Sequence, residues 1–297
     1  MKNREKVDGF LLFDKPLGMT SNFALQKLKR LLNAQKAGHI GTLDPMASGL
    51  LPVAFGQATK YMQDLFLFTK RYSASLCLGV RTTTGDREGQ VISTQPVHIG
   101  AEQMGHVLES FKGEIEQVPP MLSALKKNGR PLYELARSGI EISREPRKIT
   151  ITALEVISFE GNILTLDVEC SKGTYIRTLA EDIGAALGCG AHLCALRRTA
   201  VGSLSVLDAV SMTALEARPP QVDRLFLKPV DSLLGGLKAM EFDAQTAERL
   251  KNGQRIKLGT ESPQGCEVRI YGPSGEFLGT GLISAERVLS PWRMMAV

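Results

Sequence analysis

The segment HIGTLDPMASGL, residues 39–50, places one carboxylate, Asp44, among apolar residues, glycines and a proline. The proline that follows keeps the Asp44 backbone out of the helical region, and Gly41 permits close approach of backbone or ligand. Because glycines and proline interrupt regular structure, we predict a loop that aims one carboxylate at a fixed point. A carboxylate between apolar walls needs a cation or hydrogen bonds to stay ionised. The alternative is an Asp-Pro turn with its acid in solvent.

Around this loop, strand and helix patterns mix without strict alternation, which predicts an α+β fold. Apolar runs and alternating residues predict strands at 9–13, 72–78, 149–152 and 163–168. Thr20 and Ser21 are candidate N-caps of a helix, and helical spacing predicts further helices at 101–111, 176–187 and 246–252. The last stretch of about 60 residues carries short strands broken by glycine, as in a small β-barrel.

Charge and composition limit the function classes. The chain has 297 residues, of which 43% are hydrophobic, and a formal net charge of +5. Residues 119–148 hold seven basic and three acidic side chains, a concentration that suits a polyanion such as RNA. The alternative is a solvated loop or helix face.

Several chemistries lack their sequence signals. No phosphate-binding glycine loop follows a strand, so nucleotide hydrolysis and hydride transfer have no visible apparatus. The five cysteines form no disulfide framework, and neither a signal segment nor an apolar run of about 18 residues is present. We therefore expect a reduced, cytoplasmic protein without a membrane segment.

Two other candidate sites compete with the carboxylate loop. Cys189, His192 and Cys194 suggest zinc, but a structural site needs four ligands, so buried small residues are the favoured interpretation. His39, Asp44 and Ser48 would be a hydrolase triad, but the strand-elbow-helix signature around the serine is missing. Ser48 is better explained as a turn or cap residue.

Five motifs resemble, in order, those of the TruB-type tRNA pseudouridine synthases. The first two are FDKPLGMTS (13–21) and GTLDPMASGLLPVAFGQATK (41–60). The others are KRYSASLCLGVRTTTGDREG (70–89), CSKGTYIRTLAEDIG (170–184) and GCGAHLCALRRTAVG (188–202). Together they cover most of residues 9–202, and the tail from 240 more weakly resembles the small RNA-binding barrel of bacterial members.

The resemblance implies a fold and a reaction. The fold would be a mixed-sheet pseudouridine synthase domain, residues 1–238, followed by a PUA-like β-barrel, residues 239–297. The reaction would isomerise the uridine at position 55 in the T loop of tRNA, with no cofactor or metal. Asp44 would be the essential carboxylate, and covalent attack and ribose proton abstraction both stay open. The alternative is a non-catalytic RNA-binding protein or tRNA chaperone on the same scaffold.

The resemblance also assigns residues to a pocket for the extruded base, since a base inside folded RNA reacts only once flipped out. Tyr72 would stack on the uracil, and Tyr175 would line the same pocket. Arg177 would hold Asp44 in a charge-assisted fork. If the stretch from Tyr175 is extended, the side chains of Tyr175 and Arg177 share a face.

The remaining assignments are supporting ones. By resemblance, His39 wedges beside the flipped site and Leu196 forms a pocket wall. Lys15 would support the active-site loop, and Lys60 would meet phosphate. The family carries an insertion that closes over RNA at about residues 119–148, whose expected phosphate contacts are Lys126, Lys127 and Arg130. We expect the T-stem-loop of tRNA as partner and a monomeric enzyme.

Overall fold

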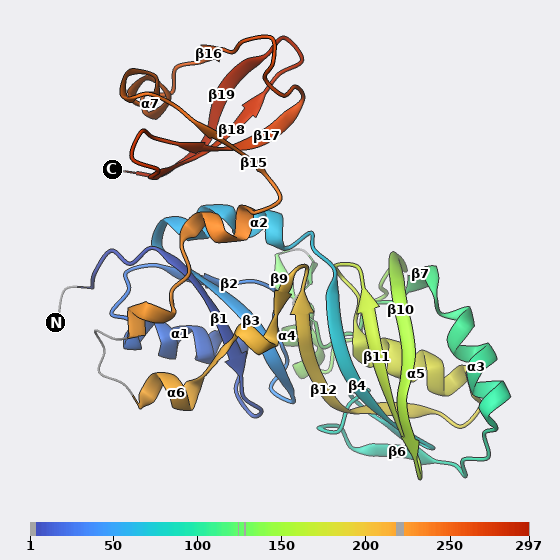
Figure 1. The fold of residues 1–297 in the computed structure, drawn as a ribbon. Coiled ribbons are helices and arrows are strands. Elements are labelled where there is room, and N and C mark those ends of the chain that lie inside the picture. The colour runs from blue at the N-terminus through green and yellow to red at the C-terminus, as the bar shows by residue number, and fades with distance from the viewer. Residues whose placement is uncertain (1–3, 124, 128, 218–222, 297) are drawn as a thin grey trace.

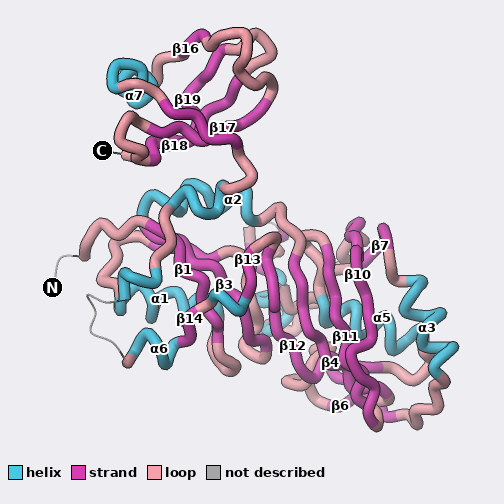
Figure 2. The backbone as a smooth tube through the Cα atoms, viewed as in Figure 1, coloured by secondary structure: helices cyan, strands magenta, loops and turns pink. Residues whose placement is uncertain are grey.

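The computed structural model describes residues 4–123, 125–127, 129–217 and 223–296. A long mixed sheet with helices forms the larger body, and the C-terminal strands form a smaller body at one side (Figure 1). Figure 2 shows the central strands of the large sheet running side by side. The predicted α+β class is confirmed.

Ten strands of the described chain form the large sheet, in the order β14-β1-β3-β12-β4-β11-β10-β7, with β2 paired to β3 and β13 to β12. Within this sheet, as far as the structure describes it, only β1–β14 and β3–β12 pair in parallel. The strands are β1 (Gly9–Lys15), β2 (Ala37–His39), β3 (Ala47–Phe55), β4 (Lys70–Leu78), β7 (Gly113–Gln117), β10 (Arg147–Glu160), β11 (Ile163–Cys170), β12 (Ala191–Val201), β13 (Leu204–Ser205) and β14 (Val210–Ser211). Two hairpins stand apart, β5 (Val80–Thr82) with β6 (Val91–Thr94) and β8 (Lys126–Lys127) with β9 (Arg130–Pro131).

Two helices of the large body, α1 (Ser21–Leu31) and α5 (Ile176–Ala186), pack on one face of this sheet, whereas Leu65 of α2 (Met62–Leu65) belongs to a separate core with Phe10 and Ala54 of the sheet. Leu28 of α1 and Ile183 of α5 belong to the same core as Leu51 and Leu76 of the sheet, because each helix carries an apolar stripe. Thr20 is the N-cap of α1, as predicted, and its hydroxyl accepts from the N–H of Phe23. The helices are α1 (Ser21–Leu31), α2 (Met62–Leu65), α3 (Ala101–Ser110), α4 (Leu132–Arg137), α5 (Ile176–Ala186), α6 (Met212–Glu216) and α7 (Ala244–Lys251), with 3₁₀ turns η1 (Gly56–Tyr61), η2 (Val206–Asp208), η3 (Asp223–Phe226) and η4 (Val230–Leu234).

The prediction of an uninterrupted loop over residues 39–50 was wrong at its C-terminal end. Strand β3 begins at Ala47 and runs through Gly49. Gly49 has φ +103°, and a Cβ there would lie 2.3 Å from the carbonyl oxygen of Arg198 on β12. Glycine therefore permits the parallel pairing of β3 and β12 instead of breaking the strand.

The smaller body is a curled five-stranded sheet covered by α7, with Leu250, Val268 and Leu289 in its own core. The predicted small C-terminal β-structure is thus confirmed. Its strands, in the order β15-β17-β18-β19-β16, are β15 (Lys238–Glu241), β16 (Ile256–Lys257), β17 (Cys266–Tyr271), β18 (Phe277–Ile283) and β19 (Val288–Met294).

The two bodies meet at η1. The Tyr61 hydroxyl donates to the carbonyl of Arg293 at 2.7 Å, and its ring lies 5.8 Å from that of Phe277. Lys60, for which a phosphate contact was expected, donates to the carbonyl of Met294 at 2.8 Å. The structure therefore places Lys60 at the contact between the bodies.

Candidate active site

Asp44 lies in the connection between β2 and β3, and hydrogen bonds fix the backbone on both sides of it. The buried Ser21 hydroxyl accepts from the N–H of Leu43 at 2.8 Å and lies 2.9 Å from its carbonyl. The Asp44 carbonyl accepts from the N–H of Ala47 at 3.0 Å. The Asp44 side chain keeps 40% of its surface exposed, so a ligand can reach the carboxylate of this fixed loop.

Arg177 is the cation beside this carboxylate. Its Nε lies 3.1 Å from Oδ2 of Asp44, and its side chain is only 7% exposed. This is one contact, where the sequence had suggested a two-point fork. Arg177 is also the second residue of α5, whose N-cap is Tyr175, so the two residues do not lie on an extended stretch.

Arg177 has a second acidic partner, Asp86, which the sequence analysis missed. Nη1 of Arg177 lies 3.5 Å from Oδ2 of Asp86, whose side chain is 5% exposed. Oδ1 of Asp86 accepts from the Thr84 hydroxyl at 2.6 Å and from the N–H of Glu88 at 3.0 Å. The local signal for Asp86 was an aspartate that accepts hydrogen bonds within its own turn. Such turns are common on protein surfaces, so the signal does not single out a functional residue.

The remaining guanidinium nitrogen of Arg177, Nη2, contacts the start of the basic insertion. Nη2 donates to the carbonyl of Leu122 at 2.7 Å. Arg177 therefore joins Asp44, the Asp86 turn and the insertion through separate nitrogens of one planar group.

Burial raises the pKa of Asp44, and the nearby charge of Asp86 raises it further. Arg177 and Lys15 oppose this rise in pKa because both favour the ionised carboxylate. A ligand can reach the Asp44 carboxylate. Partial burial raises its pKa, and therefore its basicity, while Arg177 and Lys15 favour its ionised form. Such a carboxylate is suited to act as a general base or a nucleophile.

Lys15 is fully buried and supports the same loop. Its Nζ donates to the carbonyls of Pro16 at 2.9 Å and Met19 at 2.7 Å. Burial lowers the pKa of Lys15 to about 8, and Asp44 partly offsets this. Lys15 holds a turn that includes Gly18, and the N–H of Gly18 donates to the Pro45 carbonyl at 2.8 Å. Lys15 therefore supports Pro45, the residue that follows Asp44.

Tyr72 and Leu196 lie on adjacent strands, β4 and β12, and each is 9% exposed. Leu196 pairs with Ala74, two residues along from Tyr72, so the two side chains share a face of the sheet. Burial raises the pKa of Tyr72, and the charge of Asp44 adds to that rise. The structure thus brings Tyr72 within electrostatic reach of Asp44.

Tyr175 and His39 complete the predicted set. The backbone of Tyr175 is held by Gln117, whose Oε1 accepts at 2.8 Å and whose Nε2 donates at 3.1 Å. Burial raises the pKa of the half-buried Tyr175, and Asp44 raises it further. His39 ends β2, its pKa is lowered by burial and then by Arg198, and its Nδ1 is buried without a hydrogen-bond partner. A neutral His39 fits a steric role.

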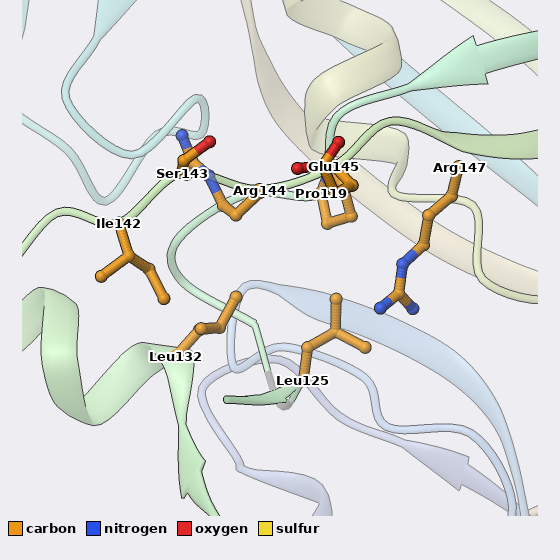
Figure 3. Close-up of a pocket in the computed structure, with 8 residues that line it drawn as sticks. All are labelled: Pro119, Leu125, Leu132, Ile142, Ser143, Arg144, Glu145 and Arg147. Carbon is orange, nitrogen blue, oxygen red and sulfur yellow. The ribbon is translucent and has the colours of Figure 1, made fainter. Parts of the chain in front are cut away.

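The insertion adds basic groups and a cavity. Arg130 is exposed on β9, whereas the side chains of Lys126 and Lys127 lie outside the described part of the structure. A cavity of about 220 Å³ lies within the insertion, and the Arg147 side chain points into it (Figure 3). Its walls are Pro119, Leu125, Leu132, Ile142, Ser143, Arg144, Glu145 and Arg147.

The alternative sites do not assemble. The Ser48 hydroxyl accepts from Arg197 at 3.4 Å, whereas His39 pairs with Val53, which lies further along β3 from Ser48. The Cys194 thiol contacts the carbonyl of Ser75, while His192 contacts that of Val80. In the described ranges, no group of three or more His, Cys, Asp or Glu residues could hold a metal ion, and no helix is long and apolar enough to cross a membrane.

Solved structures identify the class of fold. The chain aligns with one in "Crystal Structure of a Cbf5-Nop10-Gar1 Complex" at a TM-score of 0.69 and 27% identity, covering 94% of this chain and 79% of that one. A chain in "Structure of H/ACA RNP bound to a substrate RNA containing 2'-deoxyuridine" has a TM-score of 0.71 at 24% identity, covering 97% and 85%. The fold is that of the pseudouridine synthases, with a PUA-like C-terminal body.

Sequence comparisons identify the family. Residues 29–176 match the model "TruB family pseudouridylate synthase (N terminal domain)", and residues 177–235 and 239–295 match two TruB C-terminal models. The chain is 52% identical to "tRNA pseudouridine synthase B" of Aromatoleum aromaticum, covering 99% of this chain and 94% of the relative. It is 54% identical to the protein of that name from an Azoarcus species, covering 94% and 92%. The chain belongs to the TruB family of pseudouridylate synthases.

Proposed function

We propose that this chain converts the T-loop uridine at position 55 of tRNA to pseudouridine, using Asp44 as the catalytic carboxylate. The contact between Asp44 Oδ2 and Arg177 Nε, at 3.1 Å on an accessible carboxylate, carries this proposal. Family membership supports the isomerisation, and the name shared by the relatives supports tRNA as the substrate.

In this reaction the C1′–N1 bond of uridine breaks, the base rotates, and a C1′–C5 bond forms. The hydrogen on C5 is lost to a base while N1 ends protonated, so the product is an isomer and no redox cofactor is required. Asp44 acts either by attacking C1′ or by removing a ribose proton. Both routes need the ionised form, which Arg177 and Lys15 favour.

The surrounding residues receive the roles that their positions support. Tyr72 stacks on the extruded uracil, while Tyr175 and Leu196 line its pocket. His39 occupies space within the RNA next to the target uridine. Its imidazole is neutral, because burial lowers its pKa. Lys15 acts on Asp44 only through the turn that it holds.

The organisation of the chain follows the same proposal. Residues 1–238 form the catalytic domain, and residues 239–297 form a PUA-like RNA-binding domain. The insertion at about 119–148 closes over the T-stem-loop, where Lys126, Lys127 and Arg130 contact phosphates. The enzyme works as a monomer in the cytoplasm, where its tRNA substrate is found.

A pseudouridine assay on unmodified tRNA tests the proposal, with Asp208→Asn, an exposed acid on η2, as matched control for Asp44→Asn. We expect wild type and Asp208→Asn to form one pseudouridine per tRNA, and Asp44→Asn to form none while binding tRNA normally. A transcript with cytidine at position 55 should give no product. Activity in Asp44→Asn would refute the catalytic assignment. A wild-type chain that refolds tRNA without modifying it would support the chaperone alternative.

A further inference from the structure

Arg198 is a buried cation that the reaction proposed above does not use. It lies in the middle of β12, is 1% exposed, and is among the largest fully buried side chains. Among the described residues, no carboxylate lies within ion-pair distance of its guanidinium. Burying an unpaired charge is costly unless hydrogen bonds replace its water, so the contacts of Arg198 indicate why it is there.

The guanidinium of Arg198 joins both ends of the loop that carries Asp44. Nε donates to the carbonyl of Leu50 at 2.7 Å, on the C-terminal side of the loop. Nη2 donates to the carbonyls of Gly41 at 3.0 Å and Ile40 at 3.4 Å, on the N-terminal side. One planar group therefore fixes the width of the loop between these carbonyls.

Glycines on either side admit this guanidinium and its strand. A Cβ on Gly41 would lie 2.9 Å from Nη1 of Arg198. A Cβ on Gly49 would lie 2.3 Å from the Arg198 carbonyl oxygen and 2.8 Å from its backbone nitrogen. The loop sequence therefore accommodates the arginine closely.

Arg198 also lies beside Tyr72. The two residues are paired in the register of β12 and β4, so their side chains lie on one face of the sheet. The guanidinium of Arg198 opposes the rise in the pKa of Tyr72 that burial causes. Arg198 thus contacts the Asp44 loop and lies next to the aromatic residue assigned to the extruded base.

We propose that Arg198 is a positioning residue that fixes the Asp44 loop and the Tyr72 phenol relative to each other. The inference rests on the proposed function, because it concerns the same two groups. A lysine would keep the charge, but its single ammonium cannot reach the separated carbonyls and the phenol together, as a planar fork does. Displacing a reacting group by about 1 Å costs on the order of 100-fold in rate, so the fork should affect the chemical step.

The neighbouring Arg197 provides a matched control on the same strand. It points to the opposite face, where its guanidinium pairs with Asp14 at 2.8 and 3.0 Å and stays 43% exposed. We would compare Arg198→Lys with Arg197→Lys, measuring the single-turnover rate of pseudouridine formation, the tRNA Kd, and the amide hydrogen exchange of residues 40–50. Rates would be normalised to the folded fraction measured by circular dichroism.

We expect Arg198→Lys to lower the single-turnover rate by about 30-fold or more, leave the Kd within about threefold, and speed amide exchange in residues 40–50. Arg197→Lys should change none of these. Tyr72→Phe should cost less in the Arg198→Lys background than in wild type, since the phenol contact is then already lost.

Several results would overturn the inference. These are an unchanged rate in folded Arg198→Lys, an equal loss in Arg197→Lys, or a loss that lies wholly in the Kd. If the effects of Arg198→Lys and Tyr72→Phe on the rate were additive, the proposal that Arg198 positions the Tyr72 phenol would be wrong. A wild-type chain that forms no pseudouridine refutes the proposed function instead. Hydrogen exchange still tests the clamp in that case, and unchanged exchange in Arg198→Lys would refute it.

Discussion

Replacing Arg177 with methionine removes one cation from between two acids, and its effects on stability and on pH dependence can be separated. Asp86, whose side chain is 5% exposed, would lose its cation inside the protein. The Asp44 side chain is 40% exposed, so water screens its ion pair with Arg177 and the loss of that pair costs little stability. Removing one partner of a buried pair costs about 3–5 kcal/mol. The hydroxyl of Thr84 and the N–H of Glu88 still donate to Asp86, so we expect the low end, about 3 kcal/mol.

The pH dependence follows from the direction of the Asp44 shift. Arg177 lowers the pKa of Asp44, so its removal lets burial and Asp86 raise that pKa further. Because the reaction needs ionised Asp44, the acid limb of the single-turnover rate should move to higher pH. The plateau rate should also fall by about 100-fold, because the carboxylate loses the group that orients it.

Urea unfolding measures the loss in the free energy of unfolding, and single-turnover assays from pH 5 to 9 measure the shift of the acid limb. Arg71→Met is the matched control, because Arg71 pairs with Asp167 on the surface and is 49% exposed. That substitution should cost at most about 1 kcal/mol and leave the pH profile unmoved. The reasoning is refuted if the acid limb of Arg177→Met stays in place or moves to lower pH, or if its stability matches that of Arg71→Met.

Three further predictions test other contacts. Ser48→Ala should leave the turnover rate within about twofold of wild type, because that hydroxyl accepts one long contact from Arg197, whereas a hydrolase role would abolish activity. Gly49→Ala should lower the free energy of unfolding by about 2–4 kcal/mol in urea, whereas Gly105→Ala, in open space on α3, should be neutral or stabilising. Alanine at Lys126, Lys127 and Arg130 should reduce the slope of log Kd against log salt by about 2, and an unchanged slope would mean that these residues are only solvated.

Elements with strong local signals could be predicted from the sequence. Helix α1 follows from its Thr20 cap and leucine spacing, and β4 and β11 follow from alternating residues. Strand β3 could not be delimited, because whether Gly49 breaks a strand depends on the backbone of β12, which lies far away in the sequence. Local patterns do not contain that information.

The candidate site divides in the same way. Asp44 stood out locally, but its pairing with Arg177 came from resemblance, because no spacing rule joins residues so far apart in sequence. Asp86 looked like an ordinary turn acid. Arg198 had a usable signal that was missed. Successive residues of a strand point to opposite faces, so of two adjacent arginines in an apolar strand, one must face the core.

The geometry around Arg177 also relates the insertion to the reaction centre. Its Nε contacts the Asp44 carboxylate while its Nη2 donates to the carbonyl of Leu122, where the insertion begins. A movement of Leu122 therefore changes the hydrogen bonding of the same planar group that orients the carboxylate. Asp86 is the third anchor, and it is the most buried of the three contacts. Because a rigid guanidinium cannot adjust to these partners independently, we expect that closure of the insertion over RNA, as proposed above, would shift the alignment of Asp44 through this one side chain.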